Sequence, residues 1–228
     1  MPIFEGYTLY IKEARLGFPT VIVPKPQNDG PPRYNCNFIL DPTAVEWGEM
    51  GQIVQQLATD KWGDHAAAVI NMIKQDKRLR CWGNGSEKIN QKTMQVYEGF
   101  FGNVYISASS KVDHPPKLYG QNAQELPPTA NKNQMFVGGN YGAGIISFWA
   151  QENEHGRAIR ANLDGVQYIR EGEKFGAEGP DVGAMFQPVP GAPAPTAPSP
   201  MGSPAPTAPA PAPAAVTDPL SGIVDPFS

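Results

Sequence analysis

Residues 187–217 constrain the fold more than any other part of the chain, because they cannot contribute a packed core. This stretch has 11 prolines among its 31 residues and no charged side chain. A proline and alanine tract has no large apolar side chains to bury, and its prolines favour the polyproline II conformation. The sequence therefore divides into a folded body at 1–186, a disordered Pro/Ala-rich linker at 187–217 and a short tip at 218–228.

Unlike the linker, the tip contains charged and large apolar side chains, among them Asp218, Asp225 and Phe227. A flexible spacer that ends in a short acidic and apolar peptide is typical of a tether that presents a docking segment. We expect these three residues to bind a partner protein. A plain spacer with an unremarkable end is the alternative.

The body is close to electrically neutral. All 18 lysines and arginines lie in residues 1–186, together with 20 of the 22 acidic residues. The whole chain has an isoelectric point near 5.4, whereas proteins that coat duplex DNA usually carry a strong excess of basic residues. The composition argues against that class but leaves room for a local basic groove.

The two cysteines, Cys36 and Cys81, do not form a C-x-x-C pair, and a body of this size needs no disulfide. No apolar run approaches the roughly 18 residues of a membrane span, and the first residues do not resemble a signal peptide. We therefore expect a soluble cytoplasmic protein that does not contact a membrane.

The hydrophobic pattern predicts a body that is mainly β with a helical insert. Asp41-Pro42 is a typical helix start, and Asp64 can cap a second helix. Alternating apolar and polar residues predict strands at 3–12, 33–40, 97–109, 143–152 and 157–170. This order fits an OB-fold-like, partly open antiparallel barrel with a helix packed across one end. A mixed sandwich is the alternative, and the irregular order excludes a Rossmann-type sheet.

The sequence offers no catalytic or metal-binding constellation. The three histidines, His65, His114 and His155, do not lie at metal-ligand spacing from Cys, Asp or Glu. The glycine-rich segment 138–144 lacks the lysine and the following helix of a phosphate-binding P-loop. We therefore predict that the chain is not an enzyme and holds no metal or cofactor.

The segment 100–111 has one face suited to stacking nucleic-acid bases. Alternate residues of a strand share a face, so Phe101, Tyr105 and Lys111 lie together among polar side chains. Bases stack on aromatic rings and a cation binds phosphate. The alternative is that Phe101 and Tyr105 pack beneath a loop or a helix.

Other segments carry similar groups. Arg33 shares a wholly polar strand face with Asn35 and Asn37, and Trp149 is expected on an outward face of the strand at 143–152. Lys12 ends the outward face of the first strand. A further group of cations with an aromatic ring comprises Arg80, Trp82 and Lys88, although charged runs are usually solvated surfaces.

Most of 1–176 resembles the phage T-seven-type single-stranded DNA-binding proteins. This resemblance rests on the strand pattern at 3–12, on Lys25-Pro26, and on Pro32-Arg33-Tyr34 before an alternating strand, a helical insert and paired strands. The stretches 97–111 and 139–172 look like a phage protein family known as a domain of unknown function, and the two resemblances are taken together. The combined resemblance implies an OB-fold that binds single strands without sequence preference, with Arg33 on a phosphate and with Tyr105 and Trp149 stacked on bases. It also implies a disordered C-terminal tail that recruits replication proteins.

The tail departs from that family, whose tails are usually long and strongly acidic with a terminal aromatic residue. Here the tail carries only two aspartates, and its end, Asp225-Pro-Phe227-Ser228, resembles the tip of bacterial single-strand binders extended by one serine. Recruitment through this end is therefore an expectation that the extra serine could alter.

Together these observations predict sequence-independent single-stranded DNA binding in phage DNA replication or recombination, in the cytoplasm of an infected bacterial host cell. A protein-interaction scaffold with a Pro-rich tail is the alternative, and the oligomeric state stays open, a homodimer included. The predicted DNA-binding residues are Arg33, Tyr105, Trp149, Lys111, Lys12, Lys25, Phe101, Arg80, Trp82 and Lys88.

Overall fold

The structure is a computed structural model that describes residues 6–26, 30–154 and 156–175. The predicted linker at 187–217 and the predicted tip at 218–228 lie outside the described residues, as does the end of the predicted body at 176–186. Strand residues 3–5 of the first predicted strand also lie outside them.

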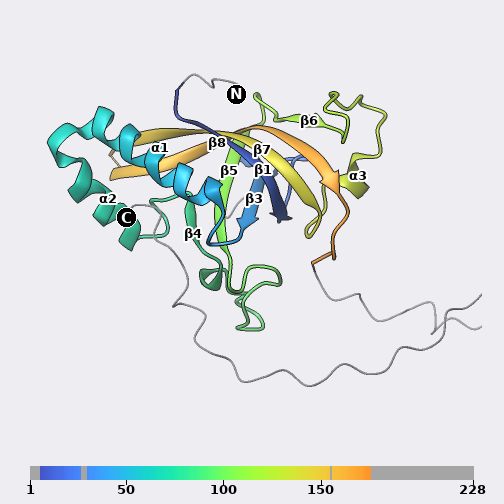
Figure 1. Cartoon of the computed structure of the whole chain (residues 1–228), viewed down its shortest axis with the longest axis horizontal. Helices are drawn as coiled ribbons and strands as arrows, with labels where there is room; N and C mark the ends of the chain where they lie inside the picture. Colours follow the sequence, from blue (N-terminus) through green and yellow to red (C-terminus); the bar gives the residue numbers. More distant parts are fainter. Residues whose placement is uncertain (1–5, 27–29, 155, 176–228) are drawn as a thin grey trace, which may run out of the picture. The chain divides into compact units, whose positions relative to one another are not determined.

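The described residues form one sheet of eight strands with a helical insert. The strands are β1 (Thr8–Gly17), β2 (Lys25–Pro26), β3 (Pro32–Leu40), β4 (Trp82–Asn84), β5 (Val104–Lys111), β6 (Lys117–Tyr119), β7 (Tyr141–Asn153) and β8 (Gly156–Arg170). The helices are α1 (Val45–Trp62), α2 (Ala66–Gln75) and α3 (Lys132–Met135), with short 3-10 turns at Gly63–His65 and Gly85–Glu87. Figure 1 shows α1 and α2 side by side, next to the long hairpin of β7 and β8.

The strands are arranged in the order β4-β5-β3-β1-β7-β8-β6, and β2 pairs with β3. Every pairing is antiparallel except that of β6 with β8. The sheet does not close by strand pairing, but the segment before β4 bridges its two sides. Ile159 of β8 donates a backbone hydrogen bond to Leu79 (2.8 Å), and Ser107 of β5 donates one to Cys81 (2.6 Å). This architecture confirms the predicted mainly β, partly open barrel with a helical insert.

The core lies between the inner face of the sheet and α1. Met50 and Val54 of α1 are completely buried, as are Phe38 of β3 and Ile146 of β7. Gly144 of β7 fits this core only because it lacks a side chain, since a Cβ there would lie 2.4 Å from the Phe38 ring.

Both helix starts are later than predicted. Asp41 does not cap α1 directly, because its carboxylate accepts hydrogen bonds from the backbone N–H (2.8 Å) and the hydroxyl of Thr43. That turn delays the helix until Val45. Asp64 lies in a 3-10 turn rather than at a helix cap, and α2 begins at Ala66.

Two strand boundaries also differ from the prediction. The strand expected at 97–109 begins only at Val104, because Gly99 and Gly102 have φ angles of 78° and 74°, which break the extended chain. The first strand continues to Gly17 instead of ending at residue 12, with a register shift between Ile11 and Ala14.

Candidate nucleic-acid interface

A groove of about 610 Å³ opens where the ends of β3 and β5 approach β6, β7 and β8. Its lining combines cations, an aromatic ring and one carboxylate. The lining residues used below are Arg33, Lys111, Lys117, Trp149, Asn162 and Asp164.

The cations are brought together by strand pairing. Arg33 of β3 lies opposite Lys111 of β5 and opposite Lys25 of β2, so three predicted basic residues are neighbours across three strands. The Arg33 guanidinium is oriented by a hydrogen bond from Nε to the Ser109 hydroxyl (3.1 Å). Like charges directly opposite one another in a sheet are destabilising, so this cluster favours an anionic ligand.

Trp149 is held with part of its ring open to solvent. Its side chain is 40% exposed, and its indole Nε1 donates a hydrogen bond to Oδ1 of Asn162 on β8 (3.2 Å). An indole fixed in this way keeps an apolar surface available for a planar partner, as the outward position predicted for Trp149 requires.

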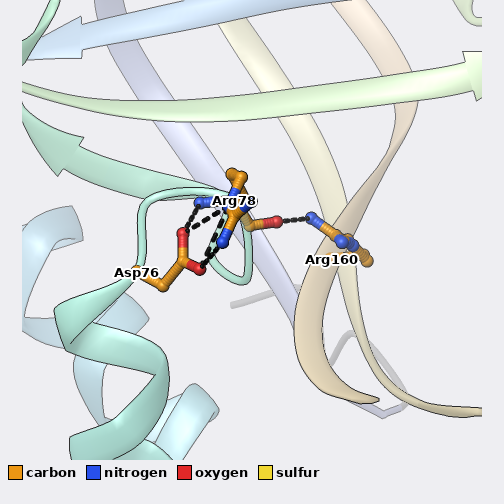
Figure 2. A network of polar contacts seen from close by, with 3 residues as sticks. All are labelled: Asp76, Arg78 and Arg160. Carbon is orange, nitrogen blue, oxygen red and sulfur yellow. Dashed lines mark hydrogen bonds and ion pairs between the residues drawn. The ribbon is translucent and has the colours of Figure 1, made fainter. Parts of the chain in front are cut away.

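The strand position opposite Trp149 is occupied by Arg160. Its guanidinium donates to the Arg78 carbonyl oxygen (2.7 Å) and to Oε1 of Gln151 (3.2 Å), as Figure 2 shows for the first of these contacts. Arg78 in turn bonds Asp76 through its guanidinium, which lowers the pKa of that carboxyl to about 2. These contacts anchor the loop after α2 to β8 beside Trp149.

Asp164 is the carboxylate of the groove, and a β-bulge positions it there. Ile145 pairs with Gly165 and Ile146 with Leu163, which leaves Asp164 as an extra residue of β8. Partial burial raises the pKa of Asp164, and a hydrogen bond with Ser147 opposes that effect. An acid among these cations lowers the positive charge that the groove offers to an anion.

Three predicted site residues are held inside the fold. Tyr105 is 7% exposed and Trp82 is 4% exposed, so neither ring is open to solvent, and Tyr105 follows the alternative in which it packs beneath another segment. The strand alternation gave the correct side of β5 for Tyr105, but the segment before β5 covers that side with Phe100, whose ring centroid lies 6.0 Å away. Arg80 is bound by both carboxylate oxygens of Glu87 (2.9 Å each) and donates to the Trp82 carbonyl.

The remaining predicted residues lie near the surface but outside the groove lining. Phe101 is 56% exposed in the turn before β5, and Lys12 is exposed on β1. The Lys88 ammonium lies 4.2 Å from the centre of the Tyr105 ring, and burial lowers its pKa. Asn35 and Asn37, expected on an open polar face, are 7% and 2% exposed.

Sequence reasoning missed Lys117, Asn162 and Asp164. Lys117 lies in a segment that the sequence presents as a long loop, and its short parallel pairing with β8 leaves no hydrophobic pattern to detect. Asn162 and Asp164 alternate with buried residues on β8 and could have been assigned to its outer face from that pattern.

The described part of the chain contains no group of three or more His, Cys, Asp or Glu side chains placed to hold a metal ion. Within the same residues, no helix has both the length and the apolar character of a membrane span.

A partly open antiparallel barrel with cations beside an exposed ring is typical of OB-type single-strand-binding proteins. Residues 7–187 match the family model described as Enterobacter phage Enc34, ssDNA-binding protein, and the chain belongs to this family. Membership confirms the predicted resemblance to phage single-stranded DNA-binding proteins. The family and its solved neighbours are single-stranded DNA-binding proteins, which are not enzymes, and this confirms the prediction that the chain is not an enzyme.

Individual relatives are distant. The chain is 27% identical over 168 residues to "Putative protein p50" of Acyrthosiphon pisum secondary endosymbiont phage 1, which covers 72% of this chain and 84% of that protein. The single-stranded DNA-binding protein from bacteriophage Enc34, solved in complex with ssDNA, aligns with a TM-score of 0.52 and 21% identity over 74% of this chain and 89% of that chain. The gp2.5 protein encoded by bacteriophage T7 aligns with 8% identity over 79% of this chain and 94% of that chain. Its TM-score of 0.46 is too low to support an argument about fold.

Proposed function

We propose that this protein binds single-stranded DNA in the groove between β5 and β8, without sequence preference. The observation that carries the proposal is the exposed Trp149 ring in one groove with Arg33, Lys111 and Lys117. Family membership supports the choice of ligand.

Each part of the groove has a separate role in this mechanism. A base stacks on the Trp149 indole, which contributes about 1–3 kcal/mol and accepts any base because every base has a π-face. Arg33, Lys111 and Lys117 bind phosphates. Each phosphate neutralised on a single strand adds about 0.7 to the slope of log affinity against log salt concentration.

The setting we propose is phage DNA replication or recombination in the cytoplasm of an infected bacterial host cell. The linker at 187–217 would carry the tip to a replication or recombination protein that Asp218, Asp225 and Phe227 recognise. A tract of 31 residues in the polyproline II conformation spans on the order of 90 Å at ~3.1 Å per residue. The tip would therefore reach partners well beyond the body.

Salt titrations of oligonucleotide binding test the phosphate contacts. We expect single strands to bind more tightly than duplex of the same length, without added Mg²⁺. Lys117→Ala should weaken single-strand binding and make the salt slope shallower by about 0.7. The matched control is Lys61→Ala, which removes an exposed lysine from the last turn of α1 and should leave the slope unchanged. An identical slope in wild type and Lys117→Ala would remove Lys117 from the phosphate path, and equal affinity for duplex would overturn the proposed ligand.

A further inference from the structure

Phe18, directly after β1, has an unusual backbone conformation. Its φ is 47°, a left-handed angle that is a genuine outlier for a bulky side chain. Leu16 is completely buried on the inner face of the sheet, and continued alternation would turn Phe18 to that same face. A strained residue of this kind persists where the surrounding structure holds it, and such residues gather at binding sites.

The left-handed backbone places the Phe18 ring against aromatic residues on the outer side of the sheet. Its ring is stacked on Phe100, with centroids 5.4 Å apart and planes at 19°, and it meets Tyr97 edge-on at 4.7 Å. Phe100 is completely buried and packs on Ile39 and Tyr105. Phe18 is nevertheless 41% exposed, so a rigidly supported ring presents apolar surface to solvent.

This aromatic stack and the cations of the groove share one face of the same two strands. Ile39 of β3 pairs with Tyr105 of β5 beside the stack, and Arg33 pairs with Lys111 at the groove. The two pairs are six residues apart along both strands, so they lie on the same face and about 20 Å from each other.

Small polar side chains occupy the face between the stack and the groove. The intervening pairs on this side are Asn37 with Ser107 and Asn35 with Ser109. Asn35 and Asn37 are only 7% and 2% exposed, so the half-buried Ser107 and Ser109 are the polar side chains that this face offers to a ligand. On this side of β5, the two serines therefore lie between the cations of the groove and the aromatic stack that carries Phe18.

We propose that Phe18 is a second base-stacking platform, reached by a single strand that leaves the Trp149 groove and runs past Ser109 and Ser107 of β5. This inference rests on the proposed function and extends its binding site. Lys88 supplies a cation at this end, since its ammonium lies 4.2 Å from the centre of the Tyr105 ring, which contacts Phe100. A surface that continues a cationic groove and carries its own lysine suits a nucleic acid better than an apolar protein segment.

Oligonucleotides of different length distinguish binding in the Trp149 groove alone from binding that also reaches Phe18. A short oligonucleotide of about four nucleotides fills the groove alone, while one of about twelve to sixteen spans the whole site, within the known range for one OB fold. Phe18→Leu keeps an apolar side chain and removes the ring, and Phe18→Gly removes the ring while relieving the left-handed backbone. Both should weaken binding of the long oligonucleotide roughly ten-fold and leave the short one unchanged. Phe18→Tyr should retain wild-type binding of both.

The control is Val45→Ala, which removes an exposed apolar side chain at the start of α1 and should alter neither affinity. Equal losses of affinity for the short and the long oligonucleotide in the Phe18 variants would show that Phe18 supports the fold. Unchanged affinity for both would show that DNA does not contact the ring. Either result overturns the inference. If the wild type binds neither oligonucleotide, the proposed function itself fails.

Discussion

Single residues decide what the groove can bind, and strand alternation identifies only some of them. Alternation placed Trp149 and Tyr105 correctly on the outer side of their strands. It could not say what covers that side, and the segment carrying Phe100 covers Tyr105 while leaving Trp149 open. The sequence did not predict a role for Phe18. Its left-handed backbone angle turns the side chain away from the face that strand alternation assigns to it.

Asp164 gives a residue-scale prediction. Its carboxylate repels phosphate within the groove, so Asp164→Asn should raise single-strand affinity a few-fold at low salt and less at high salt, where the charge is screened. The amide still accepts the Ser147 hydrogen bond, which protects the local fold. Fluorescence anisotropy with a labelled oligonucleotide measures both affinities, and equal or lower affinity of the variant at low salt would contradict this role.

The same residue predicts a pH dependence. Because the pKa of Asp164 is raised, the carboxyl keeps its proton to a higher pH than an ordinary aspartate. Its negative charge appears as pH rises through that pKa, and wild-type affinity should then fall relative to Asp164→Asn. Both proteins keep every other side chain of the groove, so the comparison isolates the Asp164 carboxyl. Parallel affinity profiles would contradict the effect.

At the scale of elements, the long strands and both main helices could be predicted, whereas the short strands could not. β7 and β8 have 13 and 15 residues, and buried residues alternate with more exposed ones through the middle of each strand. β2, β4 and β6 have two or three residues each. Two or three residues cannot show a period of two, and these strands exist only because a longer neighbour pairs with them. The groove depends on β6, which explains why its lysine was missed.

The last described residues, 171–175, have no regular secondary structure but pack against the body, which the sequence does not reveal. The Phe175 backbone N–H donates to Gly138 (3.0 Å), and Gly172 donates to Oδ1 of Asn140 (3.1 Å). Arg15 donates to the Glu173 carbonyl (2.7 Å), and its guanidinium lies 4.4 Å from the centre of the Phe175 ring. These contacts join the end of the described body to the loop before β7.

Truncation tests whether this segment belongs to the folded body. A chain ending at residue 175 should unfold at the same temperature as the full chain. A chain ending at residue 170 loses the Phe175 packing and several hydrogen bonds, which we expect to cost at least about 2 kcal/mol and to lower the melting temperature by roughly 4–8 °C. Thermal unfolding followed by circular dichroism measures the difference, and equal melting temperatures for the two truncated chains would show that 171–175 contributes nothing.

At the scale of the whole molecule, the sequence predicted the architecture and the class of ligand better than the position of the site. The composition and the order of elements indicated a partly open barrel followed by a tail. The site itself forms where β3, β5, β6, β7 and β8 meet, and residues far apart in sequence come together there only through strand pairing. The central claim is that a single strand binds in this groove with a base on Trp149.

Intrinsic tryptophan fluorescence tests that claim directly, because the chain has four tryptophans and three of them, Trp47, Trp62 and Trp82, are at most 7% exposed. Titration with single-stranded oligonucleotide should quench the emission of Trp149. Trp149→Phe should abolish the quenching but retain most of the affinity, and Trp149→Ala should lower the affinity about ten-fold or more, because the stacking ring is lost. Quenching that persists in Trp149→Phe, or full affinity in Trp149→Ala, would contradict the account.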